Sequence, residues 1–321
     1  MSALRIPDHI YDIAIIGGGP AGLTAGIYAA RGGMKTVLFG GASVASQISL
    51  TDFLENYPGI PEGINGYDLV ERFKQQARRF GTKLVLSDVS FLMKEMFGDI
   101  PAWSVRTSDE NVMALSVIVA TGATWHKLGI PSEERFIGKG VSYCATCDGP
   151  FFKNRSVVVV GGGNTAVQEA IYLTRFAARV TVIHRRDRLR ATGILAERAM
   201  ANEKIDFAWN SVVESLSGLD LLQGVRLRDV KTGTTREIPA EGMFVCVGLD
   251  PQTGLVRGLV DLAEDGSIVT GPDMRTSLPG IFACGDCIRK TLRQVVTACG
   301  DGAMAADSAQ HYVEELKGTS Y

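Results

Sequence analysis

Two stretches of the chain carry the same pattern: Asp12-Ile-Ala-Ile-Ile-Gly-Gly-Gly-Pro-Ala-Gly22 and Ser156-Val-Val-Val-Val-Gly-Gly-Gly-Asn-Thr-Ala166. Each has a continuous apolar run, a glycine triplet and small residues that begin a helix-like stretch. A second apolar run follows at the same offset, at Thr36–Phe39 and at Val180–Ile183. Because these runs are continuous rather than alternating, we expect parallel strands that are covered on both faces. The chain therefore contains two copies of a strand–turn–helix–strand unit.

Each glycine turn matches the dinucleotide-binding pattern G-x-G-x-x-G/A. The first glycine makes the turn, the second lets the backbone approach a pyrophosphate, and the third position must be small so that helix and strand pack closely. The pyrophosphate then lies on the free N–H groups at the helix N-terminus. The candidate binding residues are Gly17, Gly19, Pro20, Ala21 and Gly22 in the first copy, and Gly161, Gly163, Asn164, Thr165 and Ala166 in the second.

The segment after the second strand distinguishes the two copies. In the second copy it is His184-Arg-Arg-Asp-Arg-Leu-Arg190. Arginine at this strand end suits the 2′-phosphate of NADPH, whereas an acidic residue usually holds a 2′-hydroxyl. The candidate NADPH residues here are His184, Arg185, Arg186 and Arg190, and a solvated basic helix start is the alternative. The first copy has Phe39-Gly-Gly41 at this place, so its residues leave the type of dinucleotide open.

Composition excludes several classes of protein. The 321 residues suit about two domains, and the net charge of −2 argues against a surface for nucleic acid. Six cysteines are too few for a disulfide scaffold. Met1–Tyr11 lacks the apolar core of a signal peptide, and no run approaches the ~20 apolar residues of a membrane helix. We therefore expect a cytoplasmic protein with neither nucleic acid nor membrane as partner.

Two similar strand ends, Ile118–Gly122 and Phe244–Gly248, bracket the second copy. Both are apolar runs that stop at glycine, and we interpret them as crossings between domains. The second domain would then be an insertion at residues 123–248, and the first would comprise residues 1–122 and 249–321. The expected fold class is α/β, with two Rossmann-like dinucleotide-binding domains. Helices are predicted at Asn65–Phe80 and at Arg188–Lys204.

The cysteines fall mostly into two C-x-x-C motifs. Cys144-Ala-Thr-Cys147-Asp148 lies just before the second glycine turn, where a reversible disulfide is the favoured interpretation and Asp148 could exchange a proton with a thiolate. A zinc site is the alternative, but no Cys or His lies at zinc-finger spacing from this pair. Cys284-Gly-Asp-Cys287 has the same spacing; packing is the favoured role there, with a second redox pair as the alternative.

These motifs resemble the low-molecular-weight thioredoxin reductases, which are flavoproteins with two dinucleotide folds. The resemblance covers essentially the whole chain and also rests on Glu55–Gly59, Ala120–Gly122 and Gly285-Asp286. It implies that the first glycine turn binds FAD and that the NADPH domain is inserted into the FAD domain. It also implies that the FAD site includes Gln47, Asn56, Thr121, Gly122, Gly285, Asp286, Arg293, Gln294 and Val295.

The resemblance further implies a relay that ends on thioredoxin, and a homodimer. Hydride would pass from NADPH to FAD, and electrons would then pass to the Cys144–Cys147 disulfide. Cys147 would lie next to the flavin, Cys144 would attack the thioredoxin disulfide, and Asp148 would donate and accept the proton.

The chain departs from the family pattern in two places. Ala45-Ser46 stand where the family usually has two glycines, and the residues flanking Gly285-Asp286 are not usually both cysteine. The alternative functions are a related flavin-dependent disulfide reductase or dithiol oxidase with another partner, and a non-catalytic redox sensor that binds dinucleotides.

Overall fold

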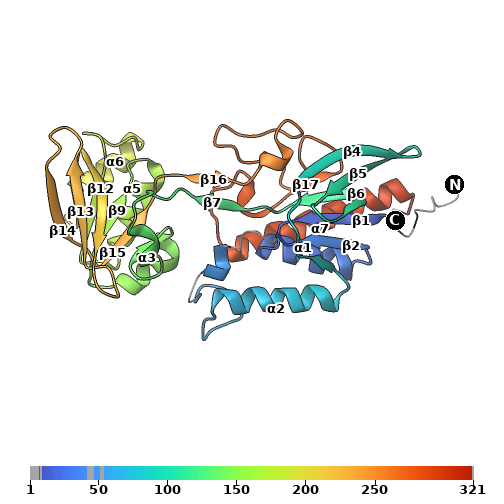
Figure 1. Ribbon diagram of the computed structural model, residues 1–321, viewed down its shortest axis with the longest axis horizontal. Coiled ribbons are helices and arrows are strands. Elements are labelled where there is room, and N and C mark those ends of the chain that lie inside the picture. The colour runs from blue at the N-terminus through green and yellow to red at the C-terminus, as the bar shows by residue number, and fades with distance from the viewer. Residues whose placement is uncertain (1–6, 8, 42–46, 51–53, 320–321) are drawn as a thin grey trace. The chain divides into compact units, whose positions relative to one another are not determined.

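The computed structural model describes residues 7, 9–41, 47–50 and 54–319 (Figure 1). The unusual Ala45-Ser46 pair lies outside these residues. The chain forms two compact units, the first comprising Met1–Thr124 with Asp250–Tyr321 and the second comprising Trp125–Leu249. The first boundary between the units thus lies between residues 124 and 125, whereas the sequence predicts it between 122 and 123. The second lies between residues 249 and 250, whereas the sequence predicts it between 248 and 249. Strands β7 (Ala123–Trp125) and β16 (Leu249–Pro251) pair with each other at these crossings.

A seven-stranded sheet of order β3-β2-β1-β6-β5-β4, with β17 also paired to β6, is the frame of the first unit. Its strands are β1 (Tyr11–Ile16), β2 (Thr36–Phe39), β3 (Lys83–Val85), β4 (Phe91–Phe97), β5 (Ile100–Arg106), β6 (Asn111–Val119) and β17 (Ile281–Ala283). Strands β1, β2, β3, β6 and β17 pair in parallel, whereas β4, β5 and β6 pair in antiparallel fashion. The carboxyl ends of β1, β6 and β17 therefore meet at one edge of the sheet.

This sheet is covered on both faces, as its continuous apolar runs predict. In β1, Ile13 and Ile15 belong to one buried core, whereas Ala14 and Ile16 belong to another. The first core is shared with three helices, α1 (Pro20–Arg31), α2 (Gly66–Arg79) and α7 (Val295–Lys317). Helices thus cover one face of β1, and the long segment before β17 covers the other.

The second unit repeats this plan in a smaller form. Its parallel sheet has the order β11-β10-β9-β15-β8, and a separate antiparallel sheet has the order β12-β13-β14. The strands are β8 (Val141–Ser142), β9 (Ser156–Val160), β10 (Arg179–Ile183), β11 (Ile205–Ala208), β12 (Ser211–Ser217), β13 (Gly224–Asp229), β14 (Thr235–Pro239) and β15 (Gly242–Val245). The helices are α3 (Glu133–Phe136), α4 (Ala145–Asp148), α5 (Asn164–Leu173) and α6 (Gly193–Met200). The order β3-β2-β1-β6 of the first unit matches β11-β10-β9-β15, so the repeat in sequence is also a repeat in structure.

The predicted helix at Asn65–Phe80 is confirmed as α2, but the one predicted at Arg188–Lys204 is wrong at both ends. Only Gly193–Met200 is helical, as α6. The backbone amides of Arg190 and Ala191 donate to the carbonyl oxygen of Gly162 at 2.7 and 3.1 Å, which holds this segment against the glycine turn. Among the described helices, none is long and apolar enough to cross a membrane.

The contact between α1 and α7 leads to a stability prediction. A Cβ on Gly302 would lie 2.2 Å from the carbonyl oxygen of Ala21, so Gly302→Ala should lower the free energy of unfolding by about 1–3 kcal/mol. Gly300→Ala is the matched control in the same helix, because nothing lies within 4 Å of its Cβ position. It should stabilise the protein by up to about 1 kcal/mol. Urea unfolding followed by circular dichroism measures both; equal values would contradict the close contact.

Candidate functional site

The first glycine turn joins β1 to α1 by way of very close backbone contacts. Gly17 has a φ of +123°, and a Cβ there would lie 2.1 Å from the carbonyl oxygen of Ala120. A Cβ on Gly22 would lie 1.9 Å from the carbonyl oxygen of Gly17. Gly19 is the N-cap of α1 and Pro20 follows it, and within the described structure no side chain caps this helix. Its first amides are therefore available to an anionic group such as a pyrophosphate.

The second turn has nearly the same geometry. Gly161 has a φ of +152°, and its Cβ would lie 2.5 Å from the carbonyl oxygen of Cys246 and 2.7 Å from the Cβ of Ala166. The N-caps of α1 and α5 adopt matching dihedral angles, with φ and ψ of −80° and −177° at Gly19 and of −88° and −179° at Gly163. Asn164 and Thr165 begin α5 as exposed residues. The two turns are thus built alike.

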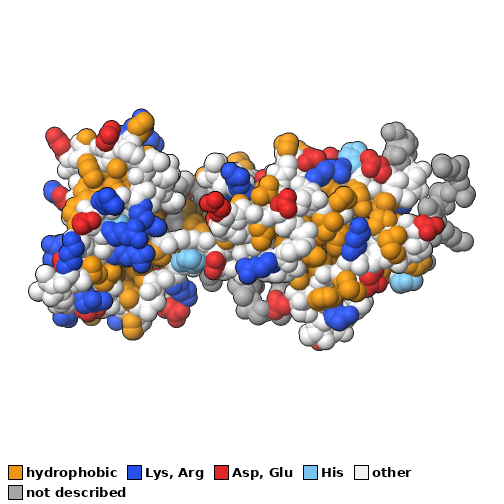
Figure 2. Space-filling view, turned by 90° about the horizontal axis from the view of Figure 1, so that it is seen from above, with side chains coloured by type: hydrophobic (Ala, Val, Ile, Leu, Met, Phe, Trp, Pro, Cys, Tyr) orange, Lys and Arg blue, Asp and Glu red, His pale blue; other side chains and the backbone are white. Residues whose placement is uncertain are grey.

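The basic segment after β10 lies beside the second turn. His184 is buried, and its Nδ1 lies 2.3 Å from the place that a Cβ on Gly162 would occupy. Burial, and then the charges of Arg190, Arg186 and Arg185, lower the pKa of His184, so the ring is neutral at neutral pH. The three arginine side chains are exposed. Figure 2 shows Lys and Arg side chains gathered on one face of this unit. His184 therefore packs under the turn while the arginines reach solvent.

The cysteines of the first C-x-x-C motif form a disulfide. Cys144 and Cys147 are bonded, with their Cα atoms 5.3 Å apart, and both are partly exposed. Cys144 is the N-cap of α4, and its backbone amide donates to Ser142 Oγ at 3.1 Å. Asp148 is the last residue of α4, directly after Cys147. No group of His, Cys, Asp and Glu side chains in the described structure is arranged to hold a metal ion.

A contact that the sequence did not predict holds the residue before this disulfide. Tyr143 donates from its hydroxyl to the Oε1 atom of Glu133 at 2.8 Å. Glu133 is buried and also accepts from the amides of Leu128 and Gly129, each at 3.0 Å. Burial, and then the Glu133 carboxylate, raise the pKa of the Tyr143 hydroxyl, which stays protonated as a donor. The residue before Cys144 is thereby fixed from α3, ten residues away.

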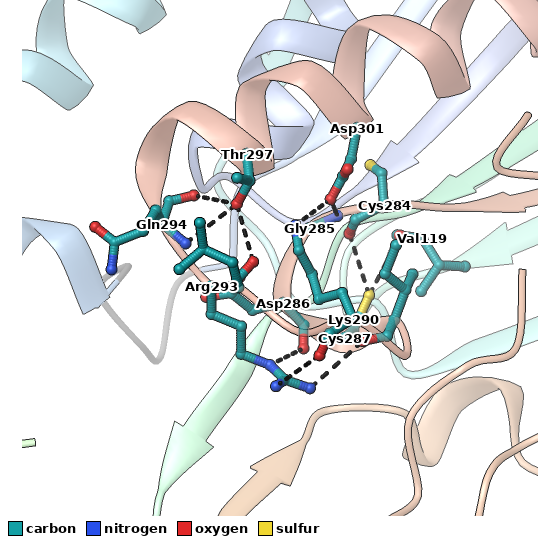
Figure 3. A network of polar contacts seen from close by, with 12 residues as sticks. Val119, Cys284, Gly285, Asp286, Cys287, Lys290, Arg293, Gln294, Thr297 and Asp301 are labelled. Carbon is teal, nitrogen blue, oxygen red and sulfur yellow. Dashed lines mark hydrogen bonds and ion pairs between the residues drawn. The ribbon is translucent and has the colours of Figure 1, made fainter. Parts of the chain in front are cut away.

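In the first unit, the Gly285 turn lies against α1 and α7. The amide of Gly285 donates to Asp301 Oδ2 at 3.2 Å, and Lys290 forms an ion pair with the same carboxylate (Figure 3). Both side chains of this ion pair are mostly buried. A Cβ on Gly285 would lie 2.8 Å from Ala21 Cβ, so this turn meets the start of α1. Neither Lys290 nor Asp301 was expected from the sequence, because their contact depends on how α7 packs.

Asp286 offers a buried acceptor beside this turn. Its Oδ1 atom is buried and has no hydrogen-bond partner among the described residues. Burial raises the pKa of this carboxyl group, while the charges of Lys290 and Arg293 lower it. Arg293 donates to the carbonyl oxygens of Asp286 and Lys290, each at 3.4 Å, and so holds the loop in place. An unpaired buried oxygen of this kind fits a hydroxyl donor of a ligand.

The remaining predicted residues of the first unit lie around the start of α7 and the end of β6. Gln294 is the N-cap of α7, Val295 is its first residue, and Asn56 Nδ2 donates to Gln294 Oε1 at 3.0 Å. Thr121 and Gly122 directly follow the Ala120 contact, and Gln47 donates from its side chain to the carbonyl oxygen of Ala123. The first of these contacts joins residues 238 positions apart in the chain, and the second joins residues 76 positions apart.

The second C-x-x-C motif behaves differently from the first. Cys284 and Cys287 are fully buried free thiols that belong to different cores. The Cys287 thiol donates to the carbonyl oxygens of Cys284 and Val119 at 3.3 and 3.6 Å. Burial raises the pKa of both thiols. Packing, the favoured expectation, therefore describes these residues in this structure.

The chain is similar to known proteins along most of its length. The model of the pyridine nucleotide-disulphide oxidoreductase family matches residues 11–302. A thioredoxin reductase of Streptomyces clavuligerus is 47% identical over 96% of this chain and 95% of its own length, and that of Bacillus subtilis is 44% identical over 97% and 98%. The crystal structure of thioredoxin reductase from Streptococcus pyogenes has a TM-score of 0.90 and 45% identity, and covers 96% of this chain and 100% of that chain. The chain belongs to the pyridine nucleotide-disulphide oxidoreductase family.

Proposed function

We propose that the chain is an NADPH-dependent, FAD-containing reductase of the thioredoxin disulfide. The observation that carries the proposal is the Cys144–Cys147 disulfide, which lies in the same unit as a dinucleotide turn bordered by arginines. Membership of the family implies a flavin and a nicotinamide cofactor. The similar proteins of Streptomyces clavuligerus and Bacillus subtilis are named thioredoxin reductases, which supports thioredoxin as the partner.

The residues of the first unit fit FAD. The free amides at the start of α1 would hold its pyrophosphate, and the buried Asp286 oxygen would accept a hydroxyl hydrogen bond. No side chain would fit at Gly17 or at Gly285. A ligand can therefore approach the backbone at both positions. When bound, FAD supplies two-electron transfer between a nicotinamide and a disulfide.

The residues of the second unit fit NADPH. The amides at the start of α5 would hold the pyrophosphate, and Arg185 and Arg186 would hold the 2′-phosphate as planar, permanently charged donors. His184 is neutral and buried, so it would support the turn rather than carry charge.

The chain's own disulfide chemistry is thiol–disulfide exchange. In the reduced enzyme, the Cys144 thiolate would attack one thioredoxin sulfur, form a mixed disulfide and release a thioredoxin thiolate, which Asp148 would protonate. Cys147 would give its proton to Asp148 and attack the Cys144 sulfur of the mixed disulfide, which re-forms the Cys144–Cys147 bond and releases the second thioredoxin thiolate. Asp148 would return the proton to this thiolate, so that thioredoxin leaves as the dithiol. Two electrons and two protons thus pass from the enzyme to thioredoxin. A cytoplasmic location and a homodimer remain predictions of the sequence.

Cys147→Ser tests the role of the disulfide. This variant should lower thioredoxin reduction by at least about a thousandfold, because no disulfide can re-form, while NADPH still bleaches the flavin absorbance. A thioredoxin-coupled assay measures the first effect, and stopped-flow absorbance measures the second. Cys299→Ala is the control, since it removes a free thiol outside the proposed exchange. Loss of flavin reduction in Cys147→Ser would contradict the assignment.

Arg185→Ala combined with Arg186→Ala tests the choice of nucleotide. Removing two charge-assisted contacts should raise KM for NADPH by roughly ten- to a hundredfold and change KM for NADH far less. Arg179→Ala is the matched control, because this exposed arginine on β10 is paired with Asp206. Steady-state kinetics with both nucleotides measure the effect. Equal increases for NADPH and NADH would refute the 2′-phosphate assignment.

A further inference from the structure

A mostly buried carboxylate on α7 lies directly behind the turn that carries Asp286. Asp301 Oδ2 accepts a hydrogen bond from the backbone amide of Gly285 at 3.2 Å and forms an ion pair with Lys290 Nζ (Figure 3). The side chains of Lys290 and Asp301 are only 12% and 18% exposed. Asp301 is not among the residues that the sequence predicts for either nucleotide, yet it contacts the backbone next to one of them.

The backbone of Asp286 is held from both of its ends. On one side, Asp301 accepts from the amide of the preceding residue, Gly285. On the other side, the Arg293 guanidinium donates to the carbonyl oxygen of Asp286 at 3.4 Å and to that of Ile288 at 3.5 Å. Because both ends are fixed, the direction in which the Asp286 side chain leaves the turn is fixed as well.

This direction matters because one oxygen of Asp286 is open to a ligand. Its Oδ1 atom is buried and has no hydrogen-bond partner in the part of the chain that the structure describes. A buried acceptor without a donor is costly, and a ligand hydroxyl that donates to it removes this cost. An acceptor that is already aimed at the ligand also loses less conformational freedom when the ligand binds. A shift of the turn would therefore weaken binding.

The close approach of α7 to α1 explains why Asp301 reaches the turn. The next residue, Gly302, lies so near α1 that a Cβ on it would be 2.2 Å from the carbonyl oxygen of Ala21. Gly285 meets the same residue, since its Cβ would lie 2.8 Å from Ala21 Cβ. The start of α1 is thus the common point at which α7 and the turn meet, and Asp301 joins them there.

Lys290 compensates the charge of this carboxylate. It lies on the loop that follows Gly285, so the same loop supplies both the amide and the cation that Asp301 binds. Removal of one member of a buried ion pair leaves the other charge uncompensated, which is strongly destabilising. Lys290 and Asp301 therefore have to be replaced together if the hydrogen bond to Gly285 is to be tested alone.

We propose that Asp301 is a positioning residue for FAD. By holding the amide of Gly285, it aims the free oxygen of Asp286 at a hydroxyl group of the cofactor and so strengthens FAD binding. Asp301 acts through the backbone of the turn, and Asp286 is the residue that meets the cofactor. The inference rests on the proposed function, in which the first unit binds FAD.

Two double variants that both lack the ion pair test the proposal. Lys290→Met with Asp301→Asn keeps a carbonyl oxygen for the Gly285 amide, whereas Lys290→Met with Asp301→Leu has a side chain of similar shape and no acceptor. The Kd for FAD should be about tenfold higher in the Leu variant than in the Asn variant, because a buried N–H loses its acceptor and the turn shifts. The holoenzyme is dialysed to equilibrium at a series of free FAD concentrations. Absorbance after denaturation gives the FAD retained per chain.

Lys290→Met with Asp301→Ala guards against misfolding of the Leu variant, and the same tenfold difference from the Asn variant is expected. Circular dichroism checks the folds. The Kd for NADP⁺, measured by calorimetry, should stay within about twofold of wild type in every variant, because the arginines lie in the other unit. An equal Kd for FAD in the folded Asn variant and a folded Leu or Ala variant, or equal losses of FAD and NADP⁺ affinity, would overturn the positioning role. A wild-type protein that retained no FAD would instead overturn the proposed function.

Discussion

Both nucleotide turns depend on one steric constraint: a carbonyl oxygen of the neighbouring strand end lies where a β-carbon would be. In the first unit this oxygen belongs to Ala120 after β6, and in the second to Cys246 after β15. Because only glycine fits, each helix begins directly at the carboxyl edge of its sheet with its first amides open to a ligand. The candidate residues of each unit gather at that edge, since this contact sets where helix, turn and neighbouring strand meet.

The two units use this shared plan for different chemistry. The second unit surrounds its turn with exposed arginines and places the disulfide before β9. The first unit instead brings a buried carboxyl group, Asp286, to the edge of its sheet from a segment that follows β17. Exposed arginines favour the binding of an additional phosphate group, and a buried hydrogen-bond acceptor favours the binding of hydroxyl groups. In the proposed function, the duplicated scaffold would bind the pyrophosphate groups, and the added segments would select between the two nucleotides.

Local patterns predicted most of the frame. The strands Thr36–Phe39 and Val180–Ile183 and the helix α2 were found because buried strands and amphipathic helices leave a periodic pattern in adjacent residues. Contacts between side chains on separate elements leave no such pattern. The pairs Glu133 with Tyr143, Lys290 with Asp301, and Glu169 with Cys246 depend on which helix packs where. The start of α6 was missed for the same reason, since the bonds from the amides of Arg190 and Ala191 to Gly162 depend on how this segment packs on the glycine turn.

The two C-x-x-C motifs show that the spacing of two cysteines does not by itself predict a disulfide. Cys147 lies in the turn of α4 and forms a disulfide with Cys144. Cys284 and Cys287 have the same spacing, but they lie at a strand end between two cores and remain separate packing thiols.

At the crossings, β7 and β16 pair, so the second unit leaves and rejoins the chain at neighbouring points. An element with adjacent ends can be gained, lost or exchanged by recombination without rethreading its host. The arginines and the disulfide therefore lie on one inserted element, so a single recombination event that moved this element would move both.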